Sequence, residues 1–353
     1  MFAAEVTQVR KLLLALLVLT SGSSTLAGDR LGPALVLNLP NAGALAFSPD
    51  GSTLAVACGS EIYVLYCEDW SEARRLVGHT GSVTCVAFSR SGAVLASSSW
   101  DGTVRLWDGA TGELRQEITV SQRASDVFAV AISPDERTVV SGAVESGTGF
   151  AMLMWFDAAT GTLARSRILS LARQTAVLGF GRTTLLTYVR AIQFSPDGAL
   201  VAAALSDKTV RIWDARGEDL VATLADHAGA VNAIAFSPDG RRLAAATWRE
   251  AAIWDVLSGT RAAALAGHRN EVRAVAYSPD GSLVATGGYD GVLRLWDAAS
   301  GELVDSVDVL KPRTGFGAPA DQGILAVAFS PDGVVLAAAG SDGRVHLCSL
   351  KGP

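Results

Sequence analysis

One short phrase, an aromatic residue followed by Ser-Pro-Asp-Gly, constrains the fold of this chain more than any other feature. Five full copies and two degenerate ones follow one another, with a base spacing of 41 residues, the interval from Phe47 to Phe88. The seven copies lie at 47–51, 88–92, 132–136, 194–198, 236–240, 277–281 and 329–333. A repeat of this length indicates units that pack only on their neighbours, so 353 residues need not form several domains.

Each phrase has the composition of a tight turn. Proline presets φ, aspartate can bond its own backbone, and glycine tolerates positive φ. Alternating apolar residues flank the phrase, and in the second repeat two further turns, at 100–102 and 110–112, delimit strands at 103–107 and 114–119. Four short strands in each repeat predict an all-β, seven-bladed β-propeller with four antiparallel strands per blade.

Two dipeptides recur at fixed places in the repeats. Trp-Asp ends the third strand in four repeats, and Gly-His opens two repeats at Gly78-His79 and Gly267-His268. The Trp-Asp pairs are Trp107-Asp108, Trp213-Asp214, Trp254-Asp255 and Trp296-Asp297. On these residues the chain resembles the WD-repeat (Trp-Asp repeat) β-propeller family, and the resemblance covers residues 34–350.

The resemblance implies a hydrogen-bonded set of four side chains inside a blade. A buried indole and a buried imidazole both need partners. The sets expected in the second and sixth blades are His79, Ser97, Asp101 and Trp107, and His268, Thr286, Asp290 and Trp296. Other blades depart from the pattern: the fifth keeps His227 and Trp254 without the turn aspartate, and Tyr66 and Cys348 are expected to replace the tryptophan in the first and seventh.

The ends of the repeat array predict how the ring closes. The last repeat stops after its third strand, at 345–350, whereas a spare strand at 34–39 precedes the first full repeat. We expect this strand to complete the seventh blade, which removes two open sheet edges. The predicted organisation is an N-terminal segment over 1–33 and the propeller over 34–353.

The N-terminal segment is open to more than one interpretation. Arg10 and Lys11 precede an apolar run at 12–19, and small residues follow as far as Ala27. This pattern favours a signal peptide cleaved after Ala27, and therefore export. The alternatives are a helix that packs on the propeller of a cytoplasmic protein, and a retained anchor, the only case in which membrane contact is expected.

Candidate catalytic and metal-ligating residues are few. Of four histidines, three occupy repeat positions. His346 is expected on a solvated strand face, at the position where the second, fourth and sixth blades have Arg105, Arg211 and Arg294. Cys58, Cys67, Cys85 and Cys348 form no Cys-x-x-Cys pair and are expected to be small buried side chains. We therefore expect no enzyme, no metal and no cofactor. A net charge of −6 without a basic stripe argues against nucleic acid.

The resemblance implies a protein-interaction scaffold, expected to be a monomeric propeller. It would bind protein partners through its top face, which carries the turns between second and third strands and the connections between blades. Long connections near 145–150, 171–188 and 308–323 fall on that face. The residues expected to contact a partner are Trp100, Trp248, Tyr289, Arg273, Arg190 and Phe128. Two alternatives stay open: the aromatic rings pack under the long connections, or the central funnel senses a small ligand or glycan.

Overall fold

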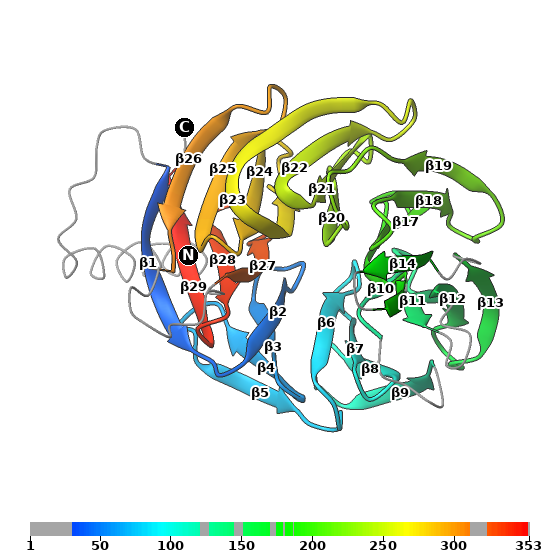
Figure 1. The fold of residues 1–353 in the computed structure, drawn as a ribbon. Coiled ribbons are helices and arrows are strands. Elements are labelled where there is room, and N and C mark those ends of the chain that lie inside the picture. Colours follow the sequence, from blue (N-terminus) through cyan, green and yellow to red (C-terminus); the bar gives the residue numbers. More distant parts are fainter. Residues whose placement is uncertain are drawn as a thin grey trace.

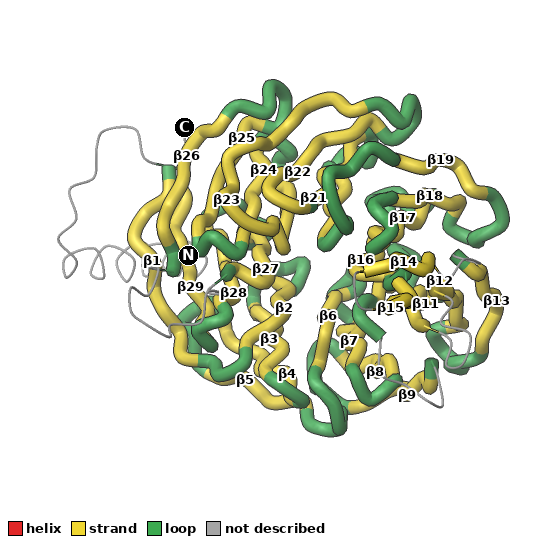
Figure 2. Tube along the Cα trace, in the orientation of Figure 1, coloured by secondary structure: helices red, strands yellow, loops and turns green. Residues whose placement is uncertain are grey.

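The computed structural model describes residues 30–120, 127–144, 151–169, 174–178, 181–185, 187–310 and 323–351, with backbone alone for Pro33, 174–178 and 181–185. The strands of the described chain form antiparallel sheets arranged around a central axis (Figure 1). Figure 2 shows that turns and loops connect these strands throughout the described chain. The all-β propeller expected from the repeats is confirmed.

Five of the sheets have four strands each. Their members, in order of pairing, are β2 (Ala42–Phe47), β3 (Thr53–Cys58), β4 (Glu61–Tyr66) and β5 (Glu72–Leu76); β6 (Val83–Phe88), β7 (Val94–Ser99), β8 (Thr103–Asp108) and β9 (Leu114–Thr119); β10 (Val130–Ile132), β11 (Thr138–Val144), β12 (Ala151–Asp157) and β13 (Leu163–Ile168); β16 (Val189–Phe194), β17 (Leu200–Leu205), β18 (Val210–Asp214) and β19 (Leu220–Leu224); and β1 (Leu31–Asn38), β29 (Arg344–Leu350), β28 (Val335–Gly340) and β27 (Ile324–Phe329).

A sixth sheet has seven strands because one long strand serves two blades. It contains β20 (Ala233–Phe236), β21 (Arg242–Ala246), β22 (Trp248–Asp255), β23 (Arg261–Tyr277), β24 (Leu283–Gly288), β25 (Val292–Asp297) and β26 (Leu303–Asp308). The first part of β23 pairs with β22 and its last part with β24, so the strand is the outer strand of the fifth unit and the inner strand of the sixth. When β23 is counted in both units, the sheets of the described chain, apart from one two-stranded hairpin, divide into seven groups of four strands.

The N-terminal strand closes the ring. β1 pairs antiparallel with β29, with Leu35 opposite Leu347 and Leu37 opposite Val345, so the last blade takes its outer strand from the start of the chain (Figure 1). The strand begins at Leu31, three residues earlier than expected, and the Leu31 backbone N–H donates to Asp305 of β26 at 2.8 Å. The predicted closure is confirmed.

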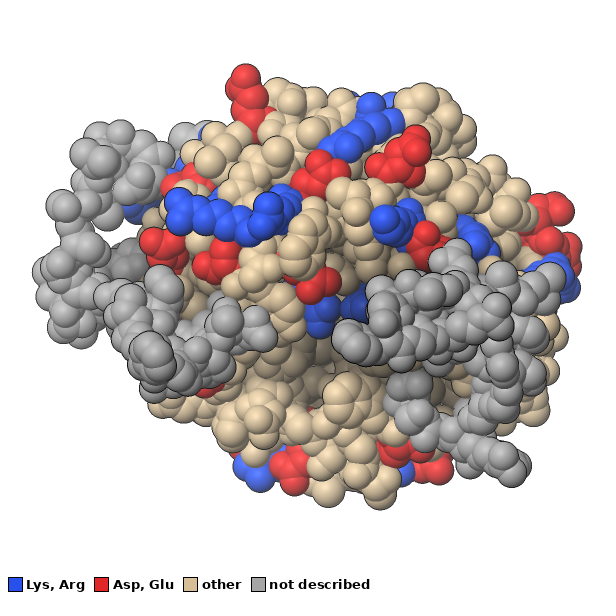
Figure 3. Space-filling view, viewed as in Figure 1, with Lys and Arg blue, Asp and Glu red and all other residues tan. Residues whose placement is uncertain are grey.

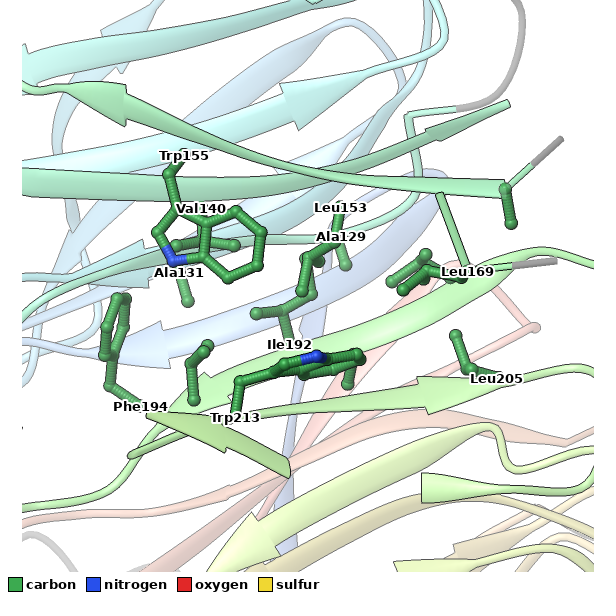
Figure 4. Close-up of a cluster of buried hydrophobic side chains, with 14 residues drawn as sticks. Ala129, Ala131, Val140, Leu153, Trp155, Leu169, Ile192, Phe194, Leu205 and Trp213 are labelled. Carbon is green, nitrogen blue, oxygen red and sulfur yellow. The ribbon is translucent and has the colours of Figure 1, made fainter. Parts of the chain in front are cut away.

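The hydrophobic core lies between blades. Figure 4 shows one cluster, in which Trp155 and Leu153 of the third blade face Ile192, Phe194 and Trp213 of the fourth. The other clusters of the described chain likewise each join two neighbouring blades. One of them packs Leu54 of the first blade with Leu347 of the last, so hydrophobic burial runs around the whole ring.

The Ser-Pro-Asp-Gly turns form the face opposite the top face. In the fourth blade Ser195 Oγ donates to Asp197 at 2.5 Å, the Ala199 N–H donates to the same carboxylate, and Gly198 has a φ of +73°. Gly198 lies against Pro134 of the preceding blade, so a side chain in its place would meet that ring. The phrase therefore specifies both the turn and its contact with the neighbouring turn.

Two side-chain predictions are wrong. Leu54 pairs with Leu65, as Leu95 pairs with Trp107 in the second blade, so Leu65 takes the tryptophan position and Tyr66 is exposed. Neighbouring strand residues face opposite sides, so an error of one residue reverses the face. His346 is only 6% exposed and bonds Asp342 at 3.2 Å, because β1 covers β29.

Other expectations on the chain have mixed outcomes. Cys58, Cys67 and Cys348 are buried thiols, whereas Cys85 is half-buried.

The connection expected at 171–188 contains a hairpin of β14 (Gln174–Leu178) and β15 (Gly181–Leu185), which the sequence did not indicate. Within the described residues, no helix has the length and apolarity needed to cross a membrane. The expected signal peptide and its cleavage site lie outside the described residues and stay predictions.

Candidate functional site

The second blade contains the complete hydrogen-bonded set. Trp107 Nε1–H donates to Ser97 Oγ at 2.9 Å, Ser97 Oγ lies 2.8 Å from His79 Nε2, and His79 Nδ1 lies 2.8 Å from Asp101. With a proton on Nδ1, each group donates to the next, and the chain of bonds ends on the carboxylate. Burial alone would raise the pKa of Asp101, but hydrogen bonds from Thr103 and His79 outweigh it and lower that pKa to about 2.

The sixth blade repeats this arrangement. Trp296 Nε1–H donates to Thr286 Oγ1 at 2.8 Å, which lies 2.8 Å from His268 Nε2, and His268 Nδ1 lies 2.9 Å from Asp290. Burial lowers the pKa of both His79 and His268, so both imidazoles are neutral near pH 7. These side chains are buried within their blades and bridge strands, which makes them part of the scaffold.

The fifth blade retains two members of the set without their partners. His227 Nε2 and Trp254 Nε1 are buried and have no hydrogen-bond partner among the described residues, and the two rings lie 4.9 Å apart. Strand pairing places Ala245 where the second and sixth blades have Ser97 and Thr286, so the bridging hydroxyl is missing. Burial, followed by the charge of Arg261, lowers the pKa of His227 to about 4.

Two of the expected top-face aromatics, Trp100 and Tyr289, occupy the same structural position, whereas Trp248 starts β22. The backbone N–H of Trp100 and of Tyr289 each donates to the carbonyl of the residue before the inner strand of its own blade, Ser82 and Glu271. Ser206 and Ser341 make the same bond in the fourth and seventh blades. Trp100 is 52% exposed and Trp248 is 49% exposed, whereas Tyr289 is half-buried. Turns need no tryptophan for their geometry, so the exposed indoles are free to contact a partner.

Tyr289 of the sixth blade contacts the seventh blade. Its ring lies directly against Gly323, the residue before the inner strand of the seventh blade. The Arg273 guanidinium also lies over this ring, 5.1 Å from its centre. Trp248 pairs with Glu271, and Glu271 lies 3.6 Å from Arg273. Arg273 and Tyr289 therefore contact each other, and Trp248 is connected to them through Glu271. No described contact connects Trp100 to this group.

The channel-lining position is a β-bulge. In the pairing of inner and second strands the register shifts at Val189/Ala191 and at Val272/Ala274, which leaves Arg190 and Arg273 as the extra residues. A bulge redirects the side chain of its extra residue. Phe128, at the same position in the third blade, makes an edge contact with Tyr188 at 5.7 Å.

The sequence interpretation missed three residues beside the starts of the inner strands: Tyr188, Asn232 and Glu271. Tyr188 and Glu271 immediately precede the valine that starts the inner strand, and Asn232 follows Val231 as Arg190 follows Val189. The signal was present, because aligning the residues on both sides of these valines identifies all three. Asn232 is buried, and its Nδ2 donates to the Val272 carbonyl at 2.9 Å.

Arg190 carries a positive charge that no carboxylate among the described residues offsets. In the described part of the chain no carboxylate lies within ion-pair distance of Arg190, and its buried Nε has no hydrogen-bond partner. Burial and then the positive charge of Arg273 lower the pKa of Arg190, and Glu271 opposes that effect. Basic side chains border the central hollow in the space-filling view (Figure 3).

The described residues offer no group of three His, Cys, Asp or Glu side chains that could hold a metal ion. The expected connection at 145–150 and residues 311–322 of the one expected at 308–323 lie outside the described residues. Strand pairing, the cores between blades and the hydrogen-bonded sets together define a β-propeller built from sequence repeats.

Five segments of the chain match the model of the family "WD domain, G-beta repeat": 70–108, 182–214, 218–255, 259–297 and 311–349. These segments make up more than half of the chain, and the chain therefore belongs to the WD-repeat family. The predicted resemblance is confirmed.

Several curated proteins are similar to this chain. Guanine nucleotide-binding protein subunit beta-5b of Danio rerio is 30% identical over 245 residues, which cover 58% of this chain and 60% of that protein. Nuclear distribution protein nudF of Aspergillus niger is 27% identical, with 55% and 44% covered. COMPASS component SWD3 of Saccharomyces cerevisiae is 26% identical, with 51% and 53% covered. The chain spans about half the length of these relatives.

Proposed function

We propose that this protein is a non-catalytic scaffold that binds a protein partner through its top face, around Trp248, Tyr289 and Arg273. The observation that carries the proposal is the exposure of two tryptophans, Trp100 on a turn and Trp248 at the start of β22, between the second and third strands of their blades. The names of two relatives support it, since one is a subunit and another a component of an assembly.

Physical reasoning favours contact at this place. Exposed indoles add apolar surface to water, and aromatic and arginine side chains dominate the binding energy of protein interfaces. Trp248 is connected to Arg273 through Glu271, and Arg273 stacks on Tyr289, so the anchors form one continuous group. Holding these side chains in place before binding reduces the entropy lost when a partner docks.

The test begins with the full chain as bait in an extract of its native organism. After the recovered partner is identified and purified, its affinity is measured by calorimetry for the wild type and for Trp248→Ala and Tyr289→Ala. Each substitution should weaken binding by about 1–3 kcal/mol, the usual loss for an interface anchor. The melting temperature of Trp248→Ala should stay close to that of the wild type.

Leu257→Ala is the matched control. Leu257 is 86% exposed on a turn of the opposite face, so its removal also deletes exposed apolar surface. It should leave the affinity unchanged. A large fall in melting temperature with intact binding for Trp248→Ala would show that the aromatic rings belong to the core. Thermal stabilisation by a sugar or metabolite, with no protein recovered, would favour the ligand-sensing alternative.

A further inference from the structure

We propose that Arg190, Asn232 and Arg273 form a binding site for one carboxylate side chain in an acidic segment of the partner. The inference rests on the proposed function and names the chemistry of the segment that enters the mouth of the central channel. The three residues occupy the same position in the fourth, fifth and sixth blades, directly after Val189, Val231 and Val272.

Two hydrogen bonds show where side chains directly after these valines lie. Thr84 Oγ1 donates to the Val127 carbonyl at 2.7 Å, and Asn232 Nδ2 donates to the Val272 carbonyl at 2.9 Å. In both cases the side chain crosses to the inner strand of the next blade. Asn232 therefore lies along the inner wall between the blades that carry Arg190 and Arg273.

Two buried polar atoms at this wall lack partners in the described part of the chain. They are Arg190 Nε, a donor, and Asn232 Oδ1, an acceptor, and Asn232 is only 8% exposed. A buried polar group without a partner destabilises a protein, and a ligand can supply the missing bond. A peptide carboxylate could accept from Arg190, and a peptide N–H beside it could donate to Asn232.

The charges at the mouth favour a single carboxylate. Glu271 lies 3.6 Å from Arg273 and offsets one of the two arginine charges, and Arg190 has no acidic partner within ion-pair distance among the described residues. One net positive charge matches one carboxylate, and the rim carboxylate of Glu271 would repel a doubly charged group. Trp248, Tyr289 and Phe128 offer apolar contacts beside the site, so apolar residues are expected next to the acidic one.

The experiment uses a phage library of random twelve-residue peptides selected on the full chain. Peptides that bind should share an Asp or Glu at a fixed place relative to an apolar residue. A synthetic copy of one such peptide is titrated against the wild type and against Arg190→Gln and Arg273→Gln. Each substitution should weaken binding at least tenfold, and raising the salt concentration should weaken wild-type binding.

Changing the acidic residue of the peptide to its amide isolates the contact. The amide peptide should bind the wild type at least tenfold more weakly, whereas Arg190→Gln should distinguish the two peptides far less. Arg241→Gln is the control, because Arg241 is an exposed arginine on the opposite face. Equal melting temperatures of the wild type and Arg190→Gln would show that the fold is unaffected.

Three results would overturn the inference: selected peptides without a common acid, unchanged binding by Arg190→Gln, or equal affinity for acid and amide peptides. If such peptides still lose binding with Trp248→Ala, the proposed top-face function stands and the carboxylate site alone falls. If no peptide depends on Trp248 or Arg190, both proposals fail.

Discussion

A missing hydroxyl distinguishes the fifth blade from the second and sixth. Ser97 and Thr286 each bridge a tryptophan to a histidine, and Ala245 has no atom that can do so. His227 Nε2 and Trp254 Nε1 are therefore left without partners in a buried place. The loss of a buried hydrogen bond of this kind typically costs about 1–3 kcal/mol.

Ala245→Ser should raise the free energy of unfolding by about 1 kcal/mol, because the new hydroxyl can accept from Trp254 and donate to His227. The change is measured by guanidinium unfolding. Ala244→Ser, on the opposite side of the same strand and also fully buried, is the control and should lower stability. A stability loss for Ala245→Ser as large as that of the control would show that the site cannot accommodate the bridge.

At the scale of elements, β1 is the part whose removal should matter most. It covers β29, and Leu31 packs into the core between the sixth and seventh blades. Without it, β29 becomes an open edge and the buried His346 is exposed. The preceding residues 1–29 are not needed for this pairing.

Removing residues 1–29 should therefore leave the melting temperature nearly unchanged, whereas removing 1–40 should lower it by at least about 5 °C. The estimate assumes a loss of a few kcal/mol and a shift of about 2 °C for each in a domain of this size. Differential scanning calorimetry of the two truncated proteins checks it. Equal melting curves would mean that β1 contributes little to ring closure.

Across the whole molecule, neutral histidines are buried in three different blades. Burial lowers the pKa of His79, His227 and His268, so the unfolded chain binds protons at a higher pH than the folded chain does. An unfolded histidine has a pKa of about 6.5. For His227, stability is greatest above that value, falls as the pH drops toward about 4, and levels off below it.

His227 alone should lower the free energy of unfolding by about 2 kcal/mol between pH 7 and pH 5. Guanidinium midpoints at the two pH values measure the total loss, to which His79 and His268 add. His227→Leu should retain less of this pH dependence than the wild type, whatever its stability at pH 7. A wild-type midpoint that does not fall toward pH 5 would contradict the burial of neutral histidines.

The sequence by itself determined the architecture and most of the scaffold. Seven phased turns and alternating strands specify blades, since backbone geometry at Pro, Asp and Gly is a local property. The spare strand at 34–39 predicted the closure, and the family resemblance carried by Gly-His and Trp-Asp implied the buried sets with their partners. These features follow from residue order and from the need to satisfy buried polar groups.

Only the tertiary structure decided which residues share a register and which charges meet. Strand pairing placed Leu65, not Tyr66, at the tryptophan position, and β1 buried His346 from the other end of the chain. Arg190, Asn232 and Arg273 lie about 40 residues apart in sequence, and they follow equivalent valines in three successive blades, with bulges at Arg190 and Arg273. The physical reason is that long-range pairing and desolvation depend on what surrounds a residue in space, which no local pattern encodes.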